Sequence, residues 1–102
     1  MSPREGDKGG DIVETVAQRV ARVWGVPAQL DMMIEECGEL IVAIHHLRRN
    51  KCDIDDVCEE IADVLFVAEQ LSEVFAPAGI IQSIKQHKES RLIQRLEAAE
   101  GK

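Results

Sequence analysis

Apolar residues recur three and four positions apart along most of this chain, and this spacing limits the possible fold more than any other feature. Because an α-helix turns once in about 3.6 residues, the spacing places these side chains on one helix face. No segment alternates apolar and polar residues with the period of two that a half-buried strand requires. We therefore predict an all-α fold. The clearest stripe consists of Leu30, Met33, Ile34, Cys37, Leu40, Ile41, Ile44 and Leu47.

Helix-breaking residues divide this pattern into four predicted helices. We expect a single domain over residues 11–98, arranged as a four-helix bundle-like subunit. Residues 1–10 lack periodicity and are rich in glycine and charge, which predicts a disordered tail, and residues 99–102 form a short C-terminal tail. The predicted helices cover residues 11–24, 28–48, 54–75 and 80–98, and they are separated by Gly25, Pro27, residues 50–53, Pro77 and Gly79.

Two of the predicted helices begin with capping signals. Asp11 followed by Glu14 resembles a capping box, so we expect the first helix to start there. The third helix follows a polar turn, and its N-cap is either Asp53 or Asp55.

The core that these helices can build is small and aliphatic, since the 102 residues include only two phenylalanines and one tryptophan. Small cores of this kind often gain stability by oligomerisation, and the helix at residues 54–75 is apolar over much of its circumference. We therefore expect a homo-oligomer.

Charge and cysteine content narrow the classes of function. A formal net charge of −7 argues against nucleic acid as a partner, because binding to phosphates needs excess Lys and Arg. The three cysteines match no zinc or redox spacing and are typical of reduced thiols. No apolar run is long enough to span a membrane and no signal peptide precedes the domain, so we expect a cytoplasmic protein without membrane contact.

One acidic pattern occurs twice. The stretch EECGELIVA at residues 35–43 aligns with EEIADVLFV at residues 59–67, which lies 24 positions later. Both read acid, acid, any residue, small residue, acid, and then four apolar residues. Single acidic runs on helices are usually solvated faces, but two copies at matching positions beside apolar stripes indicate a shared site.

If the two helices pack antiparallel across a short turn, the carboxylates of Glu36, Glu39, Glu60 and Asp63 converge. Four like charges at short range require a cation, and Mg²⁺ prefers such oxygen ligands, with Mn²⁺ as a substitute. Di-iron bundles need Glu-x-x-His pairs, which neither motif contains. We also expect the small residues inside the motifs to allow close helix approach; these are Gly38 and Ala62.

The paired motif resembles the signature of the MazG-like all-α nucleoside triphosphate pyrophosphohydrolases, a superfamily that includes dimeric dUTPases. The resemblance covers roughly residues 12–96. It implies hydrolysis of an NTP or dNTP to the monophosphate and pyrophosphate, in dimers or tetramers that act in nucleotide-pool house-cleaning. It also implies that magnesium is held by the positions matching Glu36, Glu39, Glu60 and Asp63.

Other residues receive roles with the alternatives left open. Glu35 could orient or deprotonate the attacking water, or be a surface glutamate. Trp24 could stack on a base or pack in the core, and His46 could touch substrate or lie on the surface. Base selectivity stays open, because the chain has no long insertion between the two motif helices.

Basic residues gather on the last predicted helix. Their spacing, K-x-x-K-x-x-R at residues 85–91, resembles the phosphate-contacting C-terminal region of the family. They share a side with apolar residues, so we expect their stems to lie along the bundle. The alternative is a solvated helix end. The candidate substrate-binding residues are Lys85, Lys88, Arg91 and Arg95.

A second hypothesis is a non-catalytic acidic helical module that binds a basic protein partner. The wide apolar arc of the third predicted helix motivates it. A metal response separates the two hypotheses, since only the hydrolase requires a cation among its carboxylates.

Overall fold

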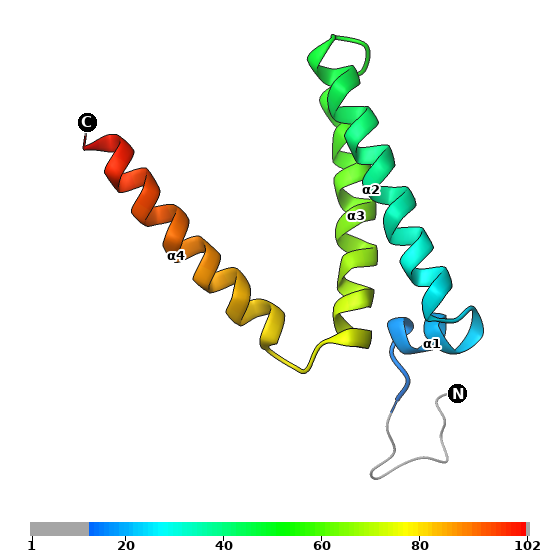
Figure 1. Cartoon of the computed structure of the whole chain (residues 1–102). Coiled ribbons are helices and arrows are strands. Elements are labelled where there is room, and N and C mark those ends of the chain that lie inside the picture. The colour runs from blue at the N-terminus through cyan, green and yellow to red at the C-terminus, as the bar shows by residue number, and fades with distance from the viewer. Residues whose placement is uncertain (1–12, 102) are drawn as a thin grey trace.

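The computed structural model describes residues 13–101, and this part of the chain folds into four α-helices without a strand (Figure 1). The predicted all-α class is confirmed. None of these helices is both long and apolar enough to cross a membrane. The helices are α1 (Val16–Val23), α2 (Val26–Arg48), α3 (Ile54–Phe75) and α4 (Ile80–Glu100).

Helix α1 begins later than predicted. Thr15 is the N-cap, its side chain accepts a hydrogen bond from the Gln18 backbone, and the Gln18 side chain accepts from the Thr15 backbone. Glu14 is not in the helix and instead pairs with Arg22 at 2.7 Å. The predicted start at Asp11 is therefore wrong, because Thr15 and Gln18 form the reciprocal cap one turn later. Asp11 itself and the predicted tail at residues 1–10 lie outside the described residues.

The break between α1 and α2 is confirmed. Gly25 has a φ of +92°, a backbone conformation that glycine adopts without steric cost, and it separates the two helices. Helix α2 starts at Val26, two residues before the predicted start, with Pro27 in its first turn. A proline fits there because the first helical N–H groups have no intrahelical partner.

A short turn joins α2 to α3 and makes them an antiparallel hairpin. Asn50 adopts a left-handed conformation with a φ of +57°, and the Lys51 N–H donates to the His46 carbonyl at 2.8 Å. Asp53, rather than Asp55, is the N-cap of α3, and it forms a capping box with Asp56. The hairpin is thus fixed by local hydrogen bonds at the point where the sequence predicted a turn.

The buried core of one chain is small. Helix α1 packs across both α2 and α3 near the open end of the hairpin. In the described part of the chain, the buried apolar side chains are Ala17, Val57 and Val67. Gln29 is also buried, and its Nε2 donates to the Ala17 carbonyl at 3.3 Å. Most of the apolar surface of α2 and α3 therefore remains uncovered.

Helix α4 stands apart from the other three helices. Pro77 and Gly79, which has a φ of +85°, redirect the chain after α3. In Figure 1, α4 slants away from the hairpin and leaves an open V between them. No residue of α4 is buried. The radius of gyration is 18.8 Å, whereas a compact domain of this length has about 13 Å. The stems of its basic residues do not lie along a bundle within one chain, contrary to our expectation.

Candidate functional site

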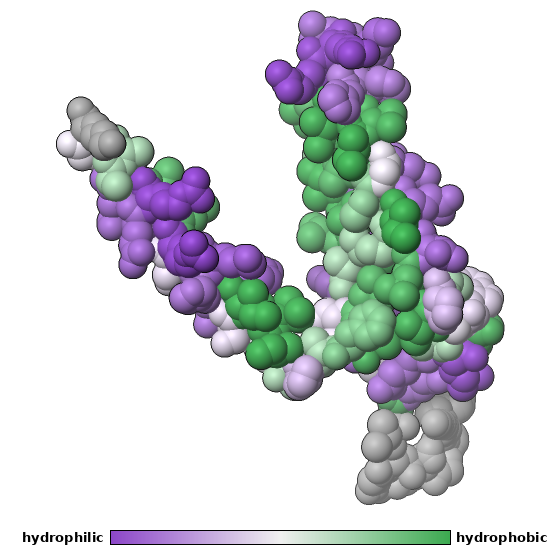
Figure 2. Space-filling model, in the orientation of Figure 1, coloured by the Kyte–Doolittle hydropathy of each residue, from purple (hydrophilic) through white to green (hydrophobic). Residues whose placement is uncertain are grey.

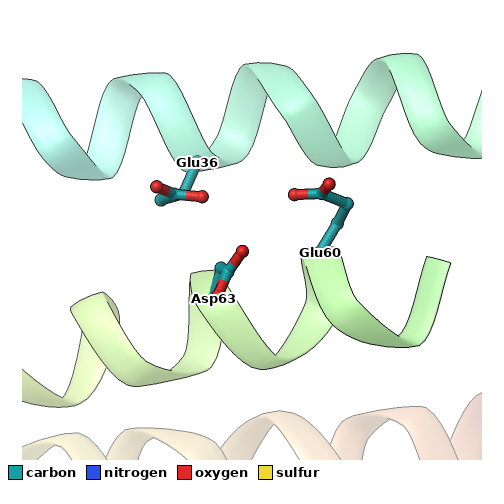
Figure 3. A group of neighbouring side chains, drawn as sticks. All are labelled: Glu36, Glu60 and Asp63. Carbon is teal, nitrogen blue, oxygen red and sulfur yellow. The ribbon is translucent and has the colours of Figure 1, made fainter. Parts of the chain in front are cut away.

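The hairpin brings the two acidic motifs face to face. One carboxylate oxygen from each of Glu36, Glu60 and Asp63 lies within 4.8 Å of the other two. Figure 3 shows these carboxylates pointing into the space between α2 and α3. The antiparallel register therefore produces the convergence that the repeated motif predicted.

Glu39 is the fourth member of this carboxylate cluster. Partial burial raises the pKa of Glu36, and the charges of Glu39, Asp63 and Glu35 raise it further. Partial burial likewise raises the pKa of Glu60, and among its charged neighbours Glu39 has the largest effect, ahead of Asp63. Glu39 thus raises the pKa of both glutamates, so its carboxylate lies near each of them. The four acids named by the sequence lie together in one cluster.

Two carboxylate oxygens of the cluster accept no hydrogen bond from any described residue. Within the described chain, Glu36 Oε1 and Glu60 Oε1 are shielded from solvent and have no hydrogen-bond partner. Buried carboxylate oxygens are costly unless a proton, a donor or a cation meets them. A hard divalent cation takes several carboxylate oxygens at once, so the residues present fit such an ion.

The raised pKa values of Glu36 and Glu60 predict a pH-dependent stability in metal-free buffer. The folded protein holds these protons more tightly than the unfolded chain, so their contribution is full below about pH 4.3, the unfolded value for Glu. It is lost as the pH rises through the raised folded pKa. Glu60→Gln mimics the protonated form, so the variant should match wild type near pH 4 and become increasingly more stable toward pH 8.

Thermal unfolding of wild type and Glu60→Gln in the presence of a chelator, measured from about pH 4 to pH 8, checks this dependence. If the stability difference between wild type and Glu60→Gln stays constant across this pH range, burial and the acidic neighbours do not raise the pKa of Glu60.

An open groove runs along one face of the hairpin beside the cluster, and we call it the carboxylate groove. It has a volume of about 690 Å³. Glu35 is exposed and lines it, and so does His46, so both candidate residues share a surface with the cluster. The groove is lined by Glu35, Gly38, Glu39, Val42, Ala43, His46, Cys52, Asp56 and Glu60.

The small residues of the two motifs do not serve helix packing. A Cβ atom added to Gly38 would meet nothing within 4 Å, and Ala62 is exposed. The expectation of close helix approach at these residues is therefore wrong. Gly38 instead widens the wall of the carboxylate groove.

A second hollow adjoins the cluster where α1 crosses the hairpin, and we call it the tryptophan hollow. Trp24 is 66% exposed, so it is not a core residue. Its ring lines the hollow together with Glu36 and Asp63. The other lining residues are apolar, apart from Gln70: Val16, Val20, Met32, Phe66 and Val67. A flat apolar surface therefore lies next to the candidate cation ligands.

Two buried amides of this region were missed in the sequence. Gln70 is only 6% exposed, and its Oε1 finds no hydrogen-bond partner among the described residues. Gln29 lies seven residues before Glu36, and Gln70 lies seven after Asp63, so the antiparallel register places both amides at one level. This heptad spacing from the acidic motifs is the signal that could have revealed them.

The basic candidates lie away from the cluster. Lys85 lines a hollow at the junction of α3 and α4, together with Leu65. Lys88, Arg91 and Arg95 are exposed farther along α4. No Lys or Arg is among the residues that line the carboxylate groove or the tryptophan hollow. Within residues 13–101, a single chain therefore offers no lysine or arginine to an anionic ligand at this site.

Comparison with known proteins gives one family. The model described as the MazG nucleotide pyrophosphohydrolase domain matches residues 27–94. The match begins at the second residue of α2, contains both acidic motifs and ends within α4. No curated protein and no solved structure gives a match.

Proposed function

This chain belongs to the MazG nucleotide pyrophosphohydrolase domain family, and we propose on that premise that it hydrolyses a dNTP or NTP to the monophosphate and pyrophosphate. The observation that carries the proposal is the carboxylate cluster, in which oxygens of Glu36, Glu60 and Asp63 lie within 4.8 Å of one another. A role in clearing nucleotides from the cellular pool follows from this activity.

The proposed cofactor is Mg²⁺, with Mn²⁺ as a substitute. The ligands would be Glu36, Glu60 and Asp63, with Glu39 beside them, since these acids supply the clustered and unpartnered oxygens. When bound, the cation supplies positive charge for the phosphate oxygens and acidifies nearby water.

We assign Glu35 the task of orienting the attacking water and accepting its proton. Glu35 lies on the wall of the carboxylate groove rather than inside the cluster, so its carboxylate is accessible to water and substrate. The water oxygen forms a bond to phosphorus, its proton passes to Glu35, and the bond joining the α- and β-phosphates breaks. We assign His46, which lines the same groove, a contact with the phosphates or the sugar.

Trp24 is the proposed platform for the nucleobase. Trp24→Ala should raise KM about tenfold with a smaller change in kcat, because stacking of a base on an aromatic ring contributes roughly 1–3 kcal/mol. Trp24→Phe keeps a flat ring and serves as the control, and it should retain most of the affinity. Steady-state kinetics on the preferred nucleotide checks this, and an unchanged KM in Trp24→Ala would remove the residue from the substrate site.

A nucleotide panel tests the proposed function. Purified protein with Mg²⁺ is incubated with each common dNTP and NTP, and the products are separated by ion-exchange chromatography. We expect a monophosphate from at least one nucleotide. If no nucleotide is converted, the proposal fails.

One observation favours a second candidate function, a helical module that binds another protein. The hairpin and α4 expose many large apolar side chains, which is typical of contact surfaces. The family assignment favours the hydrolase, and we propose that these surfaces serve a homo-oligomer, either a dimer or a tetramer.

A further inference from the structure

One side of α2 carries an apolar stripe that no other described segment of the chain covers. Its members follow the helical spacing i, i+4, i+7, i+11 and i+14, which places them on one face. The four large aliphatic members are between 41% and 71% exposed. The α2 stripe consists of Leu30, Ile34, Cys37, Ile41 and Ile44.

Helix α3 carries a matching stripe with the same spacing. Its three large members, Ile54, Ile61 and Leu65, are also exposed. In sequence order, the α3 stripe consists of Ile54, Cys58, Ile61, Leu65 and Ala68. The repeat seen in the acidic motifs therefore extends to the apolar residues beside them.

The two stripes share one face of the hairpin, and the carboxylate groove occupies the other. At about 100° per residue, each stripe is rotated in the same sense from the inward-facing acid of its helix, Glu36 or Glu60. Because α2 and α3 run antiparallel, rotation in the same sense brings both stripes to a common side. Glu35, Glu39 and His46 are rotated in the opposite sense, and they line the groove. The hairpin thus has an acidic face and an apolar face.

Helix α4 leaves the hairpin on its apolar face. Ile81 lines a hollow with Leu71 and Phe75, and the hollow beside it contains Leu65 and Lys85. Beyond these first turns α4 diverges, and Ile84, Leu92, Ile93 and Leu96 are all exposed. Figure 2 shows apolar atoms along the edge of the hairpin that faces α4 and on the nearer half of α4. Both walls of the open V are therefore apolar.

A second copy of the chain fits this V in shape and in charge. A face that presents two similar stripes can pack against its own copy around a two-fold axis. Residues 26–75 contain twelve acidic and three basic residues, whereas residues 85–95 contain four basic residues and one acidic residue. The basic helix of one chain is therefore complementary to the acidic hairpin of another.

We propose that two copies pack stripe against stripe, and that α4 of each copy carries its basic residues to the carboxylate groove of the other. Helix α4 cannot serve the groove of its own chain, because it leaves on the opposite face. A partner hairpin seated in the V turns its own groove outward, and α4, with 21 residues, is about 31 Å long, enough to extend past it. Lys88, Arg91 and Arg95 then face the partner's nucleotide. This assignment rests on the proposed function, and it makes the site incomplete in a monomer.

Mixing two inactive variants tests whether α4 of one copy serves the carboxylate groove of the other. Glu60→Gln disables the carboxylate cluster of its own hairpin and leaves α4 intact. The double variant Lys88→Ala/Arg91→Ala keeps the cluster and removes two basic residues from α4. When α4 acts on the partner, a mixed dimer contains one wild-type site, so a random equal mixture should regain about a quarter of wild-type activity. No recovery in a mixture shown to contain mixed dimers would overturn the proposal. Full activity of the double variant alone would also overturn it.

A second readout does not depend on turnover. Equal amounts of ¹⁴N- and ¹⁵N-labelled wild-type protein are mixed, exchanged and treated with a carbodiimide, which joins a lysine to a nearby carboxylate. We expect linked peptides of mixed isotope that join Lys85 or Lys88 to acids of the hairpin. Links found only within one isotope, or a monomer in light scattering, would overturn the arrangement. If wild type makes these links but hydrolyses no nucleotide, the proposed function fails and the interface stands.

A stripe variant supplies the matched control. Ile41→Lys/Leu65→Lys places charges on the apolar face at exposed positions, so circular dichroism should show the helices retained. We expect this variant to be a monomer, to give no mixed-isotope links and to lose activity although its carboxylate cluster is intact. A dimer with mixed links in this variant would show that the stripes are not the interface.

Discussion

Glutamine at position 60 is expected to lower kcat by about 100-fold or more while leaving the helices intact, since cation and preorganised charge supply several kcal/mol of transition-state stabilisation. Glu60 contributes one of the oxygens that lie within 4.8 Å of one another, and its buried Oε1 has no other partner in the described chain. Glutamine keeps the shape and removes the charge. The loss should therefore appear in kcat rather than in the fold.

Glu73→Gln is the matched control for this variant. Glu73 lies on the same helix, is exposed and lies near the junction with α4, away from the cluster. Kinetics and circular dichroism on the two variants together separate loss of the site from loss of charge on α3. Near-full activity in Glu60→Gln would remove the cluster from the chemistry.

Chelation is expected to abolish turnover, and Mg²⁺ or Mn²⁺ to restore it together with a rise in Tm. The cation relieves repulsion among four acids, so it binds the folded chain and not the unfolded one. At a hundredfold excess over its Kd, a ligand of this kind raises Tm by roughly 10 °C in a domain of this size. Differential scanning fluorimetry with and without chelator measures the shift.

Asp63→Asn decides whether the shift belongs to the cluster. We expect this variant to show little or no rise in Tm with Mn²⁺, and to be no less stable than wild type in chelator because one like charge is gone. If the chain were a protein-binding module without a metal site, Mn²⁺ would not raise the Tm of wild type or of Asp63→Asn. An equal shift in wild type and Asp63→Asn would place the cation elsewhere.

The hairpin and its cluster could be predicted because several signals in the sequence agree. Long apolar stripes fix two helices, the turn at residues 50–53 is short, and capping by Asp53 fixes where α3 starts. When two helices pack antiparallel in a fixed register, acids at the same positions of a repeated motif face one another. Glu36 and Asp63 therefore followed from spacing alone.

Two features of the fold could not be predicted from local signals. Asp11–Glu14 and Thr15–Gln18 both have the spacing of a capping box, and the pairing of Glu14 with Arg22 accompanies the second choice. The position of α4 depends on which surface covers its apolar residues, and a short-range pattern does not say whether that surface belongs to the same chain. The spacing of the basic residues on α4 is visible in the sequence, but their distance from the carboxylate cluster is not.

The most direct test of the proposed hydrolysis is the ³¹P NMR spectrum of a single reaction of wild-type protein, Mg²⁺ and the nucleotide it prefers. We expect the triphosphate resonances to disappear as the resonances of a monophosphate and of pyrophosphate grow in equal amounts, and the Glu60→Gln sample to stay unchanged. Diphosphate with orthophosphate would mean that a different bond is broken. That spectrum, or an active Glu60→Gln sample, would contradict a pyrophosphohydrolase site built from the two facing motifs.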